Sequence, residues 1–243
     1  MMLPWSVIEG VLRDYMPSRN VDKAHSIEGH MQPVYENARS IINIDLTHTR
    51  RLEINYDVLS IMVGFHDISR HVETTNPSIN HAVKGAEEVR KLLENHDKAT
   101  KYGLPILTSD EIQTIYEGIR SHRYSSNIRA NSYEGSVLQD ADRLEAVGKT
   151  GLERALKYGK KIGLPVHTPD ILPNKKYISS GSASTVNHLL EKCLAINVDS
   201  FNTIGGKELC GDGMKIMQDF VKGEIRRAPF TKPLDKVHLN RLK

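Results

Sequence analysis

Cysteine is scarce in this sequence. The chain has 243 residues but only two cysteines, Cys193 and Cys210, which stand far apart. This scarcity excludes a small disulfide-rich fold and a structural zinc site built on cysteine pairs. A globule of this length buries about 70–75% of the surface of its unfolded chain, so it needs no covalent cross-links. We expect an intracellular, cytoplasmic protein whose two thiols only fill space.

An excess of one charge and long apolar runs are also missing. Lysine and arginine number 33 against 30 aspartates and glutamates, a net charge of +3, which gives no nucleic-acid signal. No run approaches the roughly 18–20 apolar residues of a membrane span. The first ten residues, MMLPWSVIEG, lack the basic flank and long apolar core of a signal peptide. We therefore expect neither a nucleic-acid partner nor a membrane location.

Segments that alternate apolar and polar residues, as half-buried strands do, are absent at any convincing length. Apolar residues instead recur at helical spacing, which predicts an all-α protein. Predicted helices cover residues 3–16, 30–42, 56–65, 81–95, 109–122, 150–158, 184–198 and 214–226, and a further apolar segment covers 136–148. The longer predicted connections are residues 45–55, 69–80, 97–109 and 159–183, and the tail after Ala228 is predicted to fray.

Histidine, by contrast, is frequent, and its positions form a pattern. His30, His66, His81 and His122 each stand at an end of a predicted helix, and Asp67 directly follows His66. Neighbouring residues on a helix diverge by about 100°, and a metal ion is the usual small object on which two such side chains converge. For the pair alone, a buried histidine beside a capping aspartate is an equal alternative. Imidazole and carboxylate ligands suit Mn, Fe, Ni, Co, Zn or Mg.

Several short motifs accompany these histidines. HDI covers residues 66–68, His81 precedes Gly85-Ala86, a helix ends in Ser121-His122, and QDADRL covers residues 139–144. On these motifs the chain resembles the HD superfamily of metal-dependent phosphohydrolases, and in particular its stand-alone members of about this length. The segment VLQDADRLEAVG is the most specific part of the resemblance, which covers most of the chain.

The resemblance implies an HD-domain helical bundle with additional C-terminal helices. The chain would then be a single all-helical domain, residues 1–243. Its metal-binding core would cover residues 22–150, and residues 151–243 would form a helical extension packed on that core.

The resemblance also implies a ligand set. His30, His66, Asp67 and a late aspartate would hold a metal ion, with Asp142 favoured over Asp140 as that aspartate. Asp140 would then orient a histidine or a water molecule. The remaining two histidines of the series, His81 and His122, would hold a second ion or face the substrate phosphate.

The chain departs from the family pattern at two positions near its start. His25-Ser26 stands where the family often has His-Asp, and Pro33 stands where an arginine usually follows the first metal-binding histidine. His25 is therefore an alternative to His30 as the first ligand.

The implied chemistry is hydrolysis of a phosphate ester by a water molecule that one or two metal ions activate. Asp67 is a ligand and a candidate proton acceptor. Arg143 and His122 are candidates for holding phosphate oxygens, for which Lys84, Arg70 and Arg123 are weaker candidates. A salt bridge of Arg143 with Asp140 or Glu145 is the structural alternative.

The substrate is specified only by class. Nucleotides are the commonest substrates of the family, so a nucleotide or another small phosphorylated metabolite is expected, although the chain has no phosphate-binding loop of the Walker type. No macromolecular partner is expected apart from a possible second copy of the chain. Two other functions stay open: a di-iron oxygenase on the same fold, and a non-enzymatic nucleotide-binding regulatory module.

Overall fold

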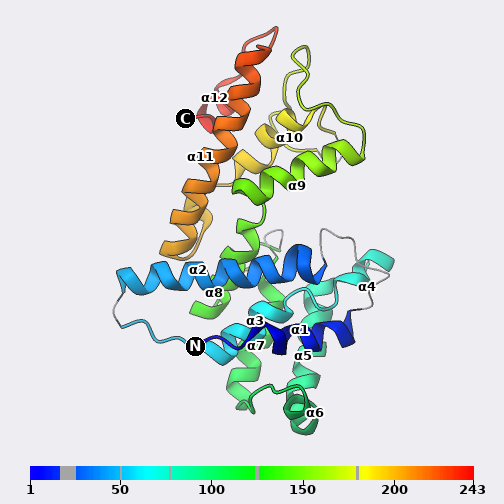
Figure 1. The fold of residues 1–243 in the computed structure, drawn as a ribbon, viewed down its shortest axis with the longest axis vertical. Coiled ribbons are helices and arrows are strands. Elements are labelled where there is room, and N and C mark those ends of the chain that lie inside the picture. Colours follow the sequence, from blue (N-terminus) through cyan, green and yellow to red (C-terminus); the bar gives the residue numbers. More distant parts are fainter. Residues whose placement is uncertain (17–25, 50, 77, 124–125, 179–180) are drawn as a thin grey trace. The chain divides into compact units, whose positions relative to one another are not determined.

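The computed structural model describes residues 1–16, 26–49, 51–76, 78–123, 126–178 and 181–243, and its secondary structure within these ranges is helical, without strands (Figure 1). This confirms the all-α prediction. Contacts divide the chain into two compact units: residues 1–143 with 202–206, and residues 144–201 with 207–243. Within the described ranges no helix is both long and apolar enough to cross a membrane. Packing of residues 151–243 on the core stays a prediction.

The first unit contains most of the helices of the described residues. They are α1 (Trp5–Tyr15), the π-helix η2 (Ile27–Met31), α2 (Gln32–His48), α3 (Tyr56–Phe65), α4 (Arg70–Thr75), α5 (His81–Glu94), α6 (His96–Lys101), α7 (Ser109–Ser121) and α8 (Tyr133–Leu144), which ends at the unit boundary. The second unit contains α9 (Gly148–Lys161), α10 (Thr185–Glu191), the short 3₁₀ helices η4 (Cys193–Ala195) and η5 (Val198–Ser200), most of α11 (Ile204–Arg227), and α12 (Lys236–Arg241).

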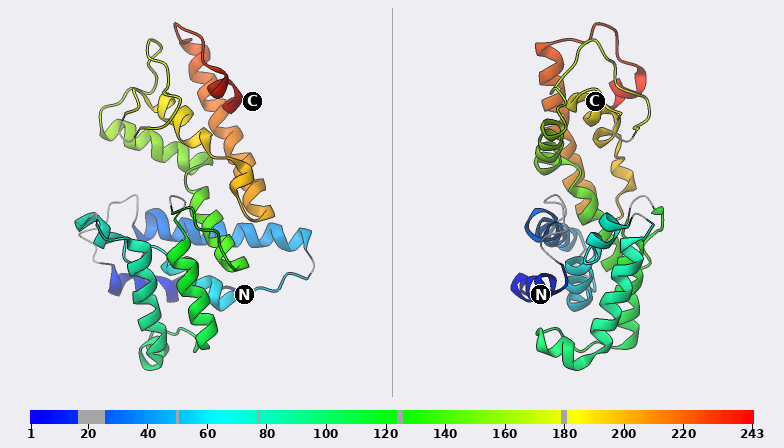
Figure 2. Two further views of the ribbon diagram at one scale, coloured as in Figure 1. Left: turned by 180° about the vertical axis from the view of Figure 1, so that it is seen from behind. Right: turned by 90° about the vertical axis from the view of Figure 1, so that its right-hand side faces the viewer.

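Helix α3 forms the centre of the first unit. All of its residues from Val58 to Phe65 are buried, because the helix packs against α1, α2 and α7 (Figures 1 and 2). The Asn55 side chain caps its first turn by accepting a hydrogen bond from the Val58 amide at 3.1 Å. A helix that is apolar on every side can be stable in water only when surrounded in this way. His66 and Asp67 directly follow its C-terminal end, and both are buried.

Helices α5 and α7 run side by side, and α7 also packs against α3 (Figure 2). A capping box between Thr108 and Glu111 begins α7, the helix that the sequence predicts over residues 109–122. Helix α5 begins at His81, and α7 ends one residue before His122. The pairing of α5 with α7 therefore brings these two histidines towards the end of α3.

Residues 202–206 belong to the first unit although they lie far along the chain. The Gly205 amide donates a hydrogen bond to the buried carboxylate of Asp45 on α2 at 2.6 Å, and the Tyr133 hydroxyl donates to the other oxygen at 2.7 Å. A Cβ atom on Gly205 would lie 2.5 Å from the carbonyl oxygen of Ile41. The segment thus depends on a glycine where α11 begins.

We expect Gly205→Ala to lower the free energy of unfolding by about 3 kcal/mol, because the added methyl group meets backbone that cannot move cheaply. Gly211→Ala is the matched control on the same helix, since a Cβ there meets no atom within 4 Å. It should raise stability by about 0.5–1 kcal/mol through helix propensity. Urea unfolding of both variants checks this, and equal effects would contradict the packing argument.

The predicted connections contain helices that the sequence pattern missed. Helix α2 continues to His48, α4 lies within residues 69–80, α6 lies within residues 97–109, and α12 lies in the tail that was predicted to fray. Helices α4, α6 and α12 have six residues each, which is too short for a periodic pattern to show.

Several helix boundaries also differ from the prediction, among them those of α8, which covers Tyr133–Leu144, and of α9, which covers Gly148–Lys161. Helix α11 begins at Ile204 rather than residue 214, because four glycines at its start weaken the helical signal. The helix predicted over residues 184–198 is α10 followed by two 3₁₀ turns, and the helix predicted from residue 30 starts earlier as η2.

Candidate metal centre

His30 is carried by the π-helix η2. The Ser26 side chain caps this turn by accepting a hydrogen bond from the Gly29 amide at 3.0 Å, and the Ser26 carbonyl accepts from the His30 amide at 2.9 Å. Short π-turns are frequent at functional sites. Ser26, one of the departures from the family pattern, therefore shapes the turn that presents His30. His25, the alternative ligand, lies outside the described residues.

His66 and His122 are fixed in the same way, each by a carbonyl three residues earlier. Nδ1 of His66 lies 2.8 Å from the Val63 oxygen, and Nδ1 of His122 lies 2.6 Å from the Ile119 oxygen. A carbonyl can only accept, so in each ring Nδ1 carries the hydrogen. In a neutral ring Nε2 then carries a lone pair, which is the form that binds metal ions.

The Nε2 atoms of the histidines converge on the carboxylate of Asp67. Oδ1 of Asp67 lies 2.9 Å from Nε2 of His81 and 3.4 Å from that of His122, and Oδ2 lies 3.5 Å from Nε2 of His30. These approaches do not give Oδ1 an aligned hydrogen bond, although Asp67 is buried. A buried oxygen that faces ring nitrogens without hydrogen bonds suits a position around a cation.

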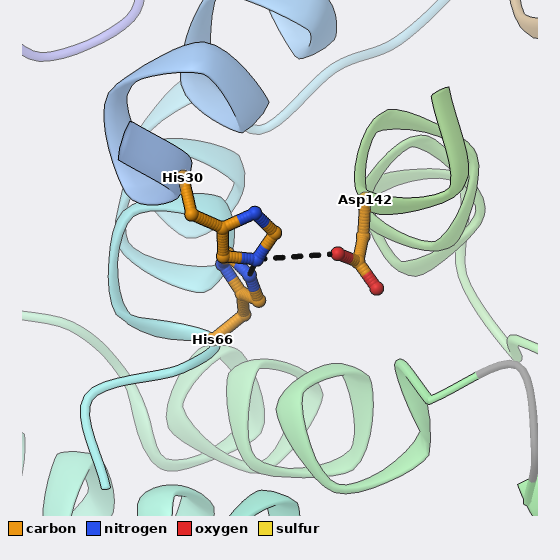
Figure 3. A group of neighbouring side chains, drawn as sticks. All are labelled: His30, His66 and Asp142. Carbon is orange, nitrogen blue, oxygen red and sulfur yellow. Dashed lines mark hydrogen bonds and ion pairs between the residues drawn. The ribbon is translucent and has the colours of Figure 1, made fainter. Parts of the chain in front are cut away.

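Asp142 closes the cluster on its other side. Figure 3 shows His30, His66 and Asp142 facing one another from η2, the end of α3 and α8, with Nε2 of His30 3.4 Å from Oδ1 of Asp142. Nε2 of His66 lies 3.2 Å from that of His30. The side chain of Asp142 is 26% exposed, which leaves one side of the cluster open.

Two overlapping groups of these side chains could hold metal ions. One is His30, His66 and Asp142, the other is His66, Asp67 and His122, and within each group the ligand atoms lie within 4.8 Å of one another. Nitrogen and carboxylate oxygen donors, largely buried and with two tautomers already set, fit a divalent cation. His81 approaches the second group through Asp67.

Three charged side chains form a cluster at the Nδ1 side of the His81 ring. Oε2 of Glu73 on α4 is hydrogen-bonded to Nδ1 of His81, Arg123 lies 3.3 Å from Oε1, and Arg70 lies 3.4 Å from Oε2. Sequence reasoning missed Glu73, because it lies in a polar stretch predicted to be a loop. Its place three residues after Arg70 was the available signal, since such spacing pairs opposite charges on a helix.

Asp140 lies outside the ligand cluster. Its buried carboxylate accepts hydrogen bonds from the amides of Asn202 and Thr203 at 2.9 and 2.7 Å and from the Thr203 hydroxyl at 2.8 Å. The predicted orientation of a histidine or water is not among these contacts. Nη1 of Arg143 lies 4.0 Å from Asp140, as the salt-bridge alternative proposed, whereas Glu145 pairs with Arg154 at 3.0 Å.

Burial and mutual charge shift the pKa values inside the cluster. Burial lowers the pKa of His66 to about 4. Burial would raise the pKa of Asp67, but His122 and His81 beside it hold that pKa well below its usual range. Burial would lower the pKa of His122, yet the Asp67 carboxylate raises it. The metal-free cluster therefore contains an ionised aspartate and a neutral His66 at neutral pH.

We expect the metal-free protein to lose stability as the pH falls from about 6.5 to about 4. The unfolded chain protonates His66 near pH 6.5 and the folded protein only near pH 4, so protons favour the unfolded chain in this window, by up to about 3 kcal/mol. The raised pKa of His122 makes stability depend on pH only above about pH 6.5, outside this window. Urea unfolding of EDTA-treated protein at several pH values checks this, and His66→Gln should flatten the slope.

The chain was compared with known proteins. The HD domain family model matches residues 19–147. A search of the curated proteins found no match. Among solved structures, an HD-superfamily hydrolase from Bacillus thuringiensis is 22% identical over 91% of this chain and 94% of its own, with a TM-score of 0.62.

Two further solved structures share the fold. A Lactobacillus plantarum protein is 22% identical over 93% of this chain and 98% of its own, with a TM-score of 0.58. Bacillus subtilis YpgQ in complex with ADP is 19% identical over 91% and 96%, with a TM-score of 0.55. At such identities the likeness shows the fold alone. The family match, however, covers more than half of the sequence, and this chain therefore belongs to the HD domain family.

Proposed function

We propose that this protein is a metal-dependent phosphohydrolase that cleaves a phosphate ester of a nucleotide or of another small phosphorylated metabolite. One observation carries the proposal. The cluster of histidines and aspartates around Asp67 lies beside a pair of arginines, Arg70 and Arg123, which contact Glu73 next to His81. This arrangement suits hydrolysis of a phosphate ester, because a metal ion can activate water and guanidinium groups can hold phosphate oxygens.

The proposed ligand set extends the two groups, because Asp67 approaches His30 as well as His122, and because His81 also approaches Asp67. His30, His66, Asp67 and Asp142 would hold one cation, and Asp67, His81 and His122 would hold a second, with Asp67 shared. A divalent cation bound here would lower the pKa of a water ligand towards about 7 and would neutralise phosphate charge. Whether the protein uses one ion or two, the N and O donors allow Mn, Fe, Ni, Co, Zn or Mg.

The residues of the chain take separate parts in this proposal. A carboxylate with a lowered pKa is a poor proton acceptor, so the pKa of Asp67 favours its role as a ligand over its role as a base. Arg70 and Arg123 would offer planar donors to phosphate oxygens. Arg143 follows Asp142 on α8 and lies 4.0 Å from Asp140, and it would be a third candidate for this role. The exposed side of Asp142 leaves the cluster open to a small substrate.

The nucleotide is favoured as substrate on one further ground. Bacillus subtilis YpgQ, which shares the fold of this chain, was solved in complex with ADP. A likeness at 19% identity shows the fold alone, so the assay described next includes nucleotides of each phosphate length.

The test is a hydrolysis panel. Nucleoside mono-, di- and triphosphates and p-nitrophenyl phosphate are incubated with EDTA-treated protein plus Mn²⁺, Ni²⁺, Co²⁺, Mg²⁺, Zn²⁺ or Fe²⁺, and released phosphate or pyrophosphate is measured. We expect release that requires added metal. Oxygen-dependent turnover with iron would support the oxygenase instead, and nucleotide binding without turnover under every metal would support the regulatory module.

A further inference from the structure

Glu73 belongs to neither ligand group, yet it touches His81 twice. Its Oε2 is hydrogen-bonded to Nδ1 of the His81 ring and lies 3.5 Å from the His81 backbone amide. His81 is the first residue of α5, where an amide has no partner within the helix and a negative charge is favourable. One carboxylate thus holds both the ring and the main chain of this residue.

The neighbours of His81 select opposite tautomers of its ring. A carboxylate accepts, so a bond with Glu73 places the hydrogen on Nδ1 and leaves a lone pair on Nε2. Nη1 of Arg70 lies 2.8 Å from the same Nδ1, and an arginine only donates. A bond with Arg70 would place the hydrogen on Nε2, which could then no longer act as a ligand.

Two observations favour the tautomer that Glu73 selects. Nε2 of His81 lies 2.9 Å from Oδ1 of Asp67 without an aligned hydrogen bond, so no well-placed acceptor at Nε2 competes with Glu73 for the ring hydrogen. Nη1 of Arg70 also donates to Oε2 of Glu73 at 3.4 Å, so this guanidinium has a carboxylate acceptor beside the ring nitrogen that it approaches at 2.8 Å. Arg123 pairs with the other oxygen of Glu73 at 3.3 Å, so the carboxylate is held between two cations.

We propose that Glu73 is a positioning residue that keeps the His81 ring protonated on Nδ1 and thereby sets the affinity of the Asp67–His81–His122 position for a divalent cation. The proposal rests on the metal centre of the proposed function, but it does not require hydrolysis. Carboxylate partners of metal-binding histidines typically contribute 10–100-fold to metal affinity. We expect Glu73→Ala to weaken one binding event by about that factor.

The chain offers a matched control for the charge change. Glu36 on α2 pairs with Arg39 at 3.4 Å, the same spacing and distance as Glu73 with Arg70, but its side chain is 51% exposed. Glu36→Ala therefore removes an ion pair of the same kind without touching a candidate ligand. Glu73→Gln keeps an oxygen that can accept from Nδ1 but removes the charge, so its affinity should fall between those of the wild type and Glu73→Ala.

The experiment titrates Mn²⁺ alone into the EDTA-treated full chain by calorimetry. We expect Glu73→Ala to weaken one Mn²⁺ site about 10–100-fold, leave the other unchanged, and add no further loss in a His81→Ala background. An affinity within twofold of the wild type, an equal further loss in that background, or wild-type binding that does not depend on His81 would each overturn the proposal. Thermal melts establish that each variant is folded.

A second readout needs no metal. The ¹⁵N spectrum of the His81 ring should report Nδ1–H in the metal-free wild type and shift towards Nε2–H in Glu73→Ala, and an unchanged spectrum would also overturn the proposal. The possible outcomes of these experiments distinguish the role of Glu73 from the proposed function. Failure of every hydrolysis assay with the Mn²⁺ and tautomer effects intact would reject the phosphohydrolase and leave the role of Glu73 standing.

Discussion

Asp67→Asn is expected to reduce metal-dependent hydrolysis by at least about 1,000-fold. Among the residues that the structure describes, Asp67 is the side chain that approaches His30, His81 and His122 together, so both proposed metal positions depend on it. Metal ions contribute several kcal/mol to stabilising charge in the transition state, and each 1.36 kcal/mol corresponds to a factor of ten in rate. The asparagine keeps the size of the side chain but removes the charge that a cation requires.

The measurement is kcat/KM on whichever phosphate ester the panel identifies, at saturating metal, together with a metal titration. Asp45→Asn is the matched control, because Asp45 and Asp67 are both buried with 4% of their surface exposed. Asp45 binds Tyr133 and Gly205 rather than the cluster, so its variant should lose stability and keep its rate. Undiminished hydrolysis by Asp67→Asn would reject the assignment of the metal centre.

The second large effect separates two aspartates on one helix. Asp142→Asn should lower metal affinity and hydrolysis by about 100-fold or more, because Asp142 faces His30 at 3.4 Å from a partly exposed position. Asp140→Asn should instead lower the free energy of unfolding by about 3 kcal/mol, because its buried charge accepts hydrogen bonds from Asn202 and Thr203. Its metal affinity in the folded state should stay near that of the wild type.

Both variants are measured by metal titration and by urea unfolding of metal-free protein, so that each serves as the control for the other. If Asp140→Asn abolished metal binding while Asp142→Asn merely destabilised the fold, the assignment of the late ligand would be reversed. If both variants lost both properties equally, α8 would act as a single structural unit and the distinction between its two carboxylates would be wrong.

The helices that could be predicted from the sequence are those with long apolar patterns. The apolar run of α3 announces a central helix, and the histidines of the series lie at or near the ends of predicted helices, so their meeting follows from packing those ends together. The preference for Asp142 over Asp140 came from the family resemblance, and periodicity could not supply it, because two residues on one helix two positions apart differ only in what each face meets.

The sequence could not predict what depends on short or distant segments. Glu73 lies on a six-residue helix without an apolar stripe, so no hydrophobic pattern indicated that its side chain would contact His81. The binding of Asn202 and Thr203 to Asp140 joins residues more than sixty positions apart, which no local pattern records. The glycines at the start of α11 weaken the helical pattern through their low helix propensity. Of these, Gly205 is required by close approach to Ile41 on α2, a contact that no local pattern records.

The anchoring of residues 202–206 has a consequence for the order of events at the ribosome. Asp45 accepts a hydrogen bond from Gly205, which is 160 residues further along the chain, and Asp140 accepts one from Asn202, which is 62 residues further. At synthesis rates of about 5–20 residues per second, the partner of Asp45 emerges roughly 8–30 s after it. Every candidate ligand from His30 to Asp142 is therefore made before the segment that completes their unit. During that interval the nascent chain presents the candidate metal ligands before Gly205 and Asn202 can bind Asp45 and Asp140.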